Sequence, residues 1–437
     1  MNRSGVLVTL IMLAGFAAML ALNWPGQLSY DSVAQLSDAR AGYYHSWHPP
    51  VMAWVMGLCD RLVRGTGLFI CFNGALALFA FHTFAQPRGA TPLSVVLALL
   101  VMLTPQWLLY EGMVWKDVMF ADAALAGFAA LSRAVTGNRA WYLPTAFLLA
   151  LAAMTRQNGI VILPAAAATL AVILWRRTSR KKAMRRAALL LVLTGGLALG
   201  GETLLALHGD HGADAADQIR LAQSYDLAGM VKSDPGFRLT RLEKSDPSLA
   251  VMLRTRGAAL YTPTWIDPLV NDEALHAAIT NAPTGLVFAQ WRDAVLIHPG
   301  LYLTTRWLVF AWVTTTPDLQ ACHALYTGVD GPPALLAELG LKRVWRPQDR
   351  LHNWYGLVLR DTPFFSHLVF GTLALLMLVI LLHRRGDSDL VAAGLLLAAL
   401  AFSLSFFVVS IACDYRYLYV LDVAAMAGAL ASAARQN

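Results

Sequence analysis

Long runs of apolar residues recur along the chain, and they limit its fold more than any other feature of the sequence. Because about 20 apolar residues in a helix cross a bilayer, the runs predict an all-α polytopic membrane protein with about ten transmembrane helices. The composition, 57% hydrophobic and 14% charged, excludes disordered chains, small disulfide scaffolds and water-soluble cytoplasmic proteins. The runs are residues 5–22, 67–84, 92–109, 118–131, 141–154, 160–175, 187–207, 364–382, 390–411 and 417–430.

The basic residues indicate the orientation of these helices. The net charge of +7 does not require a nucleic-acid partner, because basic clusters beside apolar runs mark cytoplasmic loops. No cleavage site follows the first run, so we expect a retained span with a cytoplasmic N-terminus. The loops predicted to be cytoplasmic lie around residues 88, 133–139, 176–186 and 383–385.

The polar remainder then gathers on the opposite, extracytoplasmic side. We expect an integral protein of a bacterial inner membrane with its site facing outward, and a folded helical insert between the membrane segments. The predicted parts are an N-terminal transmembrane module at 1–207, whose first outer loop is expected to be catalytic, an insert at 208–362, and C-terminal transmembrane helices at 363–437.

The segment 301–316 is apolar but short, and a crossing there would divide the basic loops between both sides. We therefore predict a helix that lies in the interface, where Arg306, Trp307 and Trp312 would meet the lipid headgroups.

Four cysteines show neither metal-binding spacing nor a paired framework. A bridge between Cys322 and Cys413 is open, but the sequence favours free buried thiols. No metal ligands are predicted, and a divalent metal stays open as a cofactor.

Asp31 follows the first span by a few residues, at the depth where headgroups meet water. A carboxylate there is placed to act as a general base. The alternative is that Asp31 only caps an amphipathic surface helix at 33–39.

The same outer loop holds further polar and aromatic residues before Pro49 and Pro50, which open a second surface helix at 51–61. Their grouping near a carboxylate suggests a polar cleft for substrate. The candidates are Tyr30, His45, Trp47 and His48.

Glu111, Lys116 and Asp117 fall in one short connection between two spans, with Asp122 inside the next span. Ionisable groups at this depth are expensive to bury unless they function. The alternative for Lys116 and Asp117 is that they anchor a helix start, where Asp117 favours the helix dipole.

Arg156 and Arg416 lie in polar breaks beside apolar runs. A planar guanidinium at that depth suits a phosphate oxygen. The alternatives are snorkelling to the interface or an internal ion pair, for which Asp414 is the expected partner of Arg416.

These motifs resemble the GT-C class of glycosyltransferases, such as protein O-mannosyltransferases and lipid A aminoarabinose transferases. The acidic residue after the first span corresponds to Asp31, and the His-Pro-Pro start of a surface helix corresponds to His48-Pro49-Pro50. A basic break between paired spans corresponds to Arg156, and an Arg-Tyr pair before a late span to Arg416-Tyr417. The class often shows an acidic pair where this chain has Asp31 alone, and the resemblance does not extend over 208–362.

The resemblance implies an inverting transfer of a sugar from a polyprenyl-phosphate donor to a hydroxyl of a glycan, lipid-linked glycan or protein. Asp31 would be the base with Asp117 as second carboxylate, and Lys116, Arg156 and Arg416 would hold the donor phosphate. Glu111 and the outer-loop residues would contact substrate. The chain shows no nucleotide-binding Gly-rich loop, and the sequence identifies neither the sugar nor the acceptor.

Two other function classes compete. A transporter or flippase would use the same arginines to bind a lipid-linked or anionic substrate, and inverted repeats would favour it, but the sequence shows none. A non-catalytic scaffold would leave Lys116, Asp117 and Arg156 unexplained.

Overall fold

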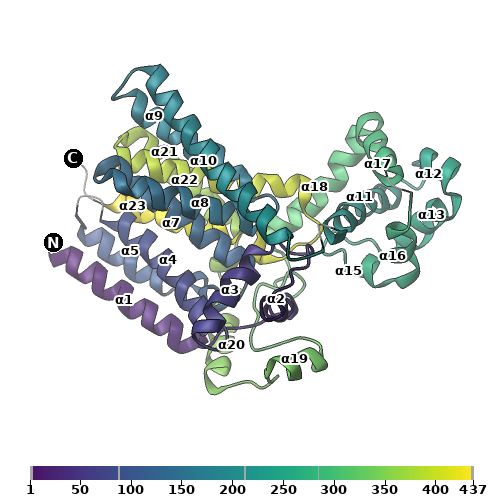
Figure 1. Cartoon of the computed structure of the whole chain (residues 1–437), viewed down its shortest axis with the longest axis horizontal. Helices are drawn as coiled ribbons and strands as arrows, with labels where there is room; N and C mark the ends of the chain where they lie inside the picture. The colour runs from purple at the N-terminus through teal and green to yellow at the C-terminus, as the bar shows by residue number, and fades with distance from the viewer. Residues whose placement is uncertain (1–2, 87–88, 211–212, 284, 435–437) are drawn as a thin grey trace. The chain divides into compact units, whose positions relative to one another are not determined.

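The computed structural model describes residues 3–86, 89–210, 213–283 and 285–434, and within these ranges the chain forms helices and isolated bridges but no strand (Figure 1). Arg88, in one of the predicted basic loops, lies outside the described residues. The chain divides into two compact units, the first made of residues 1–209, 325–403 and 416–437 and the second of residues 210–324 and 404–415.

The helices of the first unit are α1 (Arg3–Asn23), α2 (Tyr30–Ala41), α3 (Val51–Leu62), α4 (Gly67–Ala85), α5 (Pro92–Met102), α6 (Pro105–Leu108), α7 (Lys116–Thr136), α8 (Tyr142–Thr155), α9 (Ile162–Trp175), α10 (Arg180–Ala206), α19 (Pro333–Leu339), α20 (Pro347–Leu359), α21 (His367–Arg384), α22 (Asp387–Val409) and α23 (Tyr419–Ala433). Those of the second unit are α11 (Ala213–Ser233), α12 (Thr240–Ser245), α13 (Pro247–Met252), α14 (Ala258–Leu260), α15 (Asp267–Asn271), α16 (Glu273–Thr280), α17 (Leu286–Ile297) and α18 (Pro299–Thr315). The last turns of α22 belong to the second unit.

Six described helices are long and apolar enough to cross a membrane: α1, α4, α7, α10, α21 and α22. The count of about ten is not confirmed. Helices do occupy the other predicted runs, but α8 has 14 residues and α23 has 15, which is about 21–23 Å at 1.5 Å per residue and short of the ~30 Å hydrocarbon core.

The predicted run at 92–109 is also not one straight helix. It consists of α5 and a second helical piece, Pro105–Gly112, which meet at a bend of 54°. Proline at 105 removes a backbone donor and opens the second piece, and the Thr104 side chain accepts a hydrogen bond from the Trp107 amide to cap it. Residues 110–115, which follow the bend, are buried.

Helix α7 is the centre of the first unit. Of its apolar window 94% is buried, compared with 22% for α1 and 17% for α10. It packs against α4, α8 and α23, and its alanines and Gly127 allow the neighbours to approach closely (Figure 1). Because α7 is fixed on all sides, its first residues, Lys116 and Asp117, have a fixed place.

Backbone hydrogen bonds fix the segment that precedes α2. The Gln27 amide donates to the Gly112 carbonyl (2.9 Å) and the Gln27 carbonyl accepts from Val114 (3.0 Å), while the Leu28 amide donates to Gly328 (2.9 Å). Gly112 is required here, because a Cβ atom would overlap the Asn23 side chain. The start of α2 is thereby held beside the start of α7.

The second unit has its own core of buried aliphatic and aromatic side chains, and one buried ion pair within it corrects a prediction. Arg306 of α18 is 1% exposed and pairs with Asp226 of α11 at 2.9 Å, and its Nε donates to the Phe407 carbonyl (2.8 Å). The prediction that Arg306 meets the lipid headgroups is therefore wrong. Trp307, its neighbour, is 59% exposed, and α18 is not among the candidate spans; its place in the interface stays a prediction.

The preference for free thiols at Cys322 and Cys413 is wrong, because the two form a disulfide across 91 residues of sequence. The turn after Thr316 and the segment after α22 are brought together by further backbone bonds, from Tyr415 to Cys322 and from Cys413 to Thr264, both 2.8 Å. This pairing is a long-range contact that cysteine spacing does not reveal.

The compact units also divide the chain differently from the predicted insert at 208–362. Residues 325–362 belong to the first unit, since Leu28 bonds with Gly328 and Asp330 and accepts a hydrogen bond from the Tyr326 hydroxyl (2.9 Å). The assignment of these parts to the sides of a membrane stays a prediction.

Candidate active site

Asp31 lies in the first turn of α2. The N-cap of that helix is Ser29, so Asp31 is not its cap, and the capping alternative is excluded. The carboxylate instead accepts a hydrogen bond from Nη1 of Arg416 (3.0 Å), and Nε2 of His48 lies 3.7 Å from its other oxygen. With 30% of its side chain exposed, Asp31 remains open to a molecule from outside.

The charges around Asp31 decide its ionisation. Burial works to raise the pKa of Asp31, but attraction by Arg416, His48 and Lys116 holds that pKa well below its usual range. Burial and the nearby Lys116 lower the pKa of His48, against the attraction of Asp31. At neutral pH the site therefore presents a carboxylate beside a neutral imidazole.

Lys116 connects α7 to this carboxylate through the histidine. Its Nζ lies 3.0 Å from Nδ1 of His48. An ammonium at Lys116 can only donate, so in that charge state Nδ1 is the acceptor and the N–H lies on Nε2, facing Asp31. His48 lies two residues before Pro50, the N-cap of α3, and that helix begins at Val51 as the sequence predicts.

Behind Asp31 lies a second, deeper ion pair. Arg156 at the end of α8 pairs with Asp117, and their side chains are 8% and 3% exposed. Arg416 also approaches Asp117, with Nε 3.9 Å from Oδ2, so this one guanidinium lies between the two carboxylates. The ion pair that positions Arg416 is with Asp31, whereas the predicted partner Asp414 contacts His323 at 3.3 Å.

Aromatic rings cover the guanidinium faces. Arg416 lies over Trp115 with 5.1 Å to the ring centroid, and Arg156 lies over Tyr417 at 5.1 Å. The indole N–H of Trp115 donates to the Ser29 hydroxyl (2.9 Å), which ties it to the start of α2. Such contacts fix the planes of the guanidinium groups.

The structure thus brings together six of the ten predicted residues, which we call the Asp31 cluster. Three basic side chains, two carboxylates and a neutral imidazole meet at the starts of α2, α3 and α7, the end of α8 and the turn before α23. The Asp31 cluster consists of Asp31, His48, Lys116, Asp117, Arg156 and Arg416.

The other four predicted residues lie elsewhere. Tyr30 and Trp47 are 60% and 40% exposed, and His45 is exposed with its ring against Tyr43. Glu111 is fully buried and accepts a hydrogen bond from the Tyr419 hydroxyl (2.9 Å), inside the helix bundle. Their roles toward a substrate stay predictions.

Sequence reasoning missed the part played by Trp115 and Tyr417, although both adjoin charged residues that it singled out. An aromatic directly beside Lys116 or Arg416 is the signal that was present. Within the described ranges, no group of three or more His, Cys, Asp or Glu side chains is placed to hold a metal ion.

Comparison with known proteins leaves the family open. No protein-family model and no curated protein matches the chain. The chain is similar to the solved structure of arabinosyltransferase EmbB from Mycobacterium smegmatis, with 16% identity and a TM-score of 0.36 over 97% of this chain. It spans 40% of that protein's length, and a similarity this weak carries no argument about activity.

Proposed function

We propose that the protein is a membrane glycosyltransferase that moves a sugar from a polyprenyl-phosphate donor to a hydroxyl acceptor. The observation that carries the proposal is the partly exposed carboxylate of Asp31 held between Arg416 and His48, next to Lys116. Such a transfer requires a general base close to cations that can bind the donor phosphate. The motif resemblance to the GT-C class, at Asp31, His48, Arg156 and Arg416, supports the same proposal.

The reaction would proceed in one displacement. Asp31 takes the proton of the acceptor hydroxyl, whose oxygen forms a new bond to the anomeric carbon. The bond from that carbon to the phosphate oxygen breaks, and polyprenyl phosphate leaves with the electron pair, so the configuration inverts. General-base assistance of this kind contributes about 10²- to 10⁴-fold.

In this step Arg416 would act on both the base, Asp31, and the donor phosphate. Its guanidinium already binds Asp31, and a donor phosphate would compete for the same N–H groups. Partial withdrawal of Arg416 from Asp31 would raise the pKa of that carboxyl and make it a stronger base once the donor is bound. Asp117 is buried against Arg156, which favours a positioning role for it over proton transfer.

The direct test incubates the purified full-length protein with polyprenyl phosphates that carry tritiated hexoses or pentoses and with a cell-envelope extract that supplies the acceptor hydroxyl. We expect label to leave the lipid and free polyprenyl phosphate to appear. In liposomes, movement of the intact donor between leaflets without cleavage would instead support the transporter alternative and contradict the glycosyltransferase.

The pH dependence of kcat/KM tests the link between Arg416 and Asp31. Because the base is active as a carboxylate and its pKa is depressed, wild-type kcat/KM should stay flat down to about pH 4. In Arg416→Gln the burial of Asp31 outweighs the attraction by the remaining cations, and the pKa of Asp31 rises. The pH at which kcat/KM falls on the acid side should therefore increase by about 1–3 units. Arg416→Lys keeps the charge and should keep the limb low.

Arg61→Gln is the matched control for that experiment, because Arg61 is an exposed arginine at the end of α3 that makes the same change in net charge. Identical acid limbs in wild type, Arg416→Gln and Arg61→Gln would show that Arg416 does not set the ionisation of the base.

Sidedness is a separate part of the proposal. Disulfides persist outside the reducing cytosol, so the bridge between Cys322 and Cys413 supports an extracytoplasmic place for both. Reporter fusions should give a cytoplasmic signal after Arg180 and an extracytoplasmic signal after Gly331. A cytoplasmic signal at Gly331 would reverse the predicted side of the loops after α18.

A further inference from the structure

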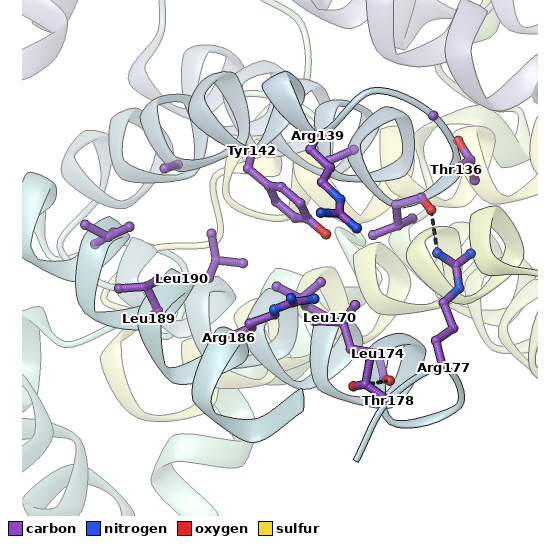
Figure 2. A pocket seen from close by; sticks show the side chains of 15 residues that line it. Thr136, Arg139, Tyr142, Leu170, Leu174, Arg177, Thr178, Arg186, Leu189 and Leu190 are labelled. Carbon is purple, nitrogen blue, oxygen red and sulfur yellow. Dashed lines mark hydrogen bonds between the residues drawn. The ribbon is translucent and has the colours of Figure 1, made fainter. Parts of the chain in front are cut away.

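A charged cavity lies at the ends of α7 and α8 that are opposite to the Asp31 cluster. It has a volume of about 770 Å³ and is lined from the α7–α8 connection, α9 and the start of α10 (Figure 2). We call it the α7–α10 pocket. Its polar side chains include Arg139, Tyr142, Arg177 and Arg186, and its apolar wall includes Leu170, Leu174, Leu189 and Leu190.

The pocket and the Asp31 cluster are separated by the length of α7. Lys116 begins this 21-residue helix in the Asp31 cluster, and Thr136 ends it at the pocket. At 1.5 Å per residue the helix spans about 30 Å, which matches the hydrocarbon thickness of a bilayer. The pocket therefore lies at the opposite membrane boundary and cannot be a subsite of the Asp31 cluster.

The arginines of the pocket differ in how they are engaged. Arg177 donates to the Val135 carbonyl (2.9 Å) and pairs with Asp387. Arg139 and Arg186 are exposed and form no ion pair in the part of the chain that the structure describes. Tyr142 interacts electrostatically with all three guanidinium groups, so they share one space.

Figure 2 shows that the side chains of Arg139 and Arg186 approach this space from opposite walls, with the Tyr142 hydroxyl between them. Basic residues at a membrane boundary usually spread toward headgroups and water. Here the guanidinium groups of Arg139 and Arg186 and the Tyr142 hydroxyl instead lie together beside the leucine side chains. Two positive charges in one place repel each other unless an anion lies between them.

We propose that the α7–α10 pocket binds a phosphate group through Arg139, Arg186 and the Tyr142 hydroxyl. Forked guanidinium donors match phosphate oxygens, and a hydroxyl supplies a further donor. The leucine wall beside these donors fits the acyl chain of a lipid phosphate, while the donors alone would also hold a small soluble phosphate. The two sources share the phosphate chemistry and differ in their need for the apolar wall.

The test measures binding to the purified full-length protein in non-ionic detergent. The probes are dioctanoyl phosphatidic acid, dioctanoyl phosphatidylcholine and glycerol 3-phosphate. We expect saturable binding of phosphatidic acid, and a loss of at least about tenfold in affinity in Arg139→Gln/Arg186→Gln, from two lost charge-assisted contacts. The matched control is Lys182→Gln/Arg185→Gln, which removes the same total charge at the start of α10 but outside the pocket.

Each outcome decides one point. Phosphatidic acid that binds more tightly than glycerol 3-phosphate, with loss only in the pocket variant, supports a lipid phosphate. Equal binding of both, again lost only in the pocket variant, supports a soluble phosphate. Equal affinity in the pocket and control variants, or equal binding of the zwitterionic phosphatidylcholine, overturns the proposal. The single variants Arg139→Gln and Arg186→Gln give the same readout should the double variant fail to fold.

Discussion

Asp31→Asn is expected to lower turnover by about 10²- to 10⁴-fold while the protein stays folded. The amide keeps the shape of the side chain and its oxygen can still accept from Arg416, but it cannot take up a proton at neutral pH. A partly exposed ion pair contributes about 1 kcal/mol or less, so the melting temperature should change little. Transfer of label from a tritiated polyprenyl-phosphate sugar gives the rate.

Asp38→Asn is the matched control, because it makes the same substitution on the same helix, two turns away from the Asp31 cluster. A second readout separates proton transfer from positioning. In Asp31→Ala a small carboxylate such as formate can occupy the vacated space and accept the proton, so added formate should restore part of the rate. Near-normal turnover by Asp31→Asn would move the search for a base to Asp117.

The part of this site that the sequence predicted is the part that local rules determine. Asp31, Lys116, Arg156 and Arg416 each lie at the end of a helix, and helix ends follow from where apolar runs stop and prolines begin. Helices that are packed side by side then bring their ends to common levels. That is why residues far apart in sequence could be assigned to one group.

The direction in which a side chain points from a helix end could not be predicted from these local rules. Glu111 lies only five residues before Lys116, yet it points into the bundle toward Tyr419, because the 54° bend and a short helical turn at Tyr110–Gly112 rotate it away. One residue turns a helix by about 100°, so a boundary error of one residue changes the direction of a side chain.

Long-range pairing was the other limit. Arg306 and Asp226 meet across 80 residues, and Cys322 and Cys413 across 91. The amphipathic character of α18 gave no sign that its arginine faces inward, because an arginine followed by tryptophans fits a headgroup position equally well. A buried carboxylate on another helix decides the matter, and nothing in the local pattern identifies it.

Arg156→Ala is expected to lower turnover by about 10²- to 10³-fold, the effect of removing one donor that stabilises a developing negative charge. A sugar phosphodiester carries one negative charge and the departing phosphate gains a second, so the loss should appear in kcat more than in donor affinity. Arg156→Lys keeps the charge without the fork that faces Asp117 and Tyr417, so it should be impaired less. Single-turnover rates and donor titrations separate the two quantities.

Arg156→Ala should also lower the stability of the protein, and this effect must be separated from the effect on turnover. Without Arg156 the buried carboxylate of Asp117 keeps only the more distant Arg416, at 3.9 Å, and breaking a buried pair costs about 3–5 kcal/mol of stability. Arg156→Ala/Asp117→Asn removes the unpaired charge, so thermal unfolding should return toward wild type. Turnover should remain low in this double variant if Arg156 acts on the departing phosphate. Recovery of turnover together with stability would mean that Arg156 only neutralises Asp117, and Arg416 and Lys116 would then be left as the groups that stabilise the leaving phosphate.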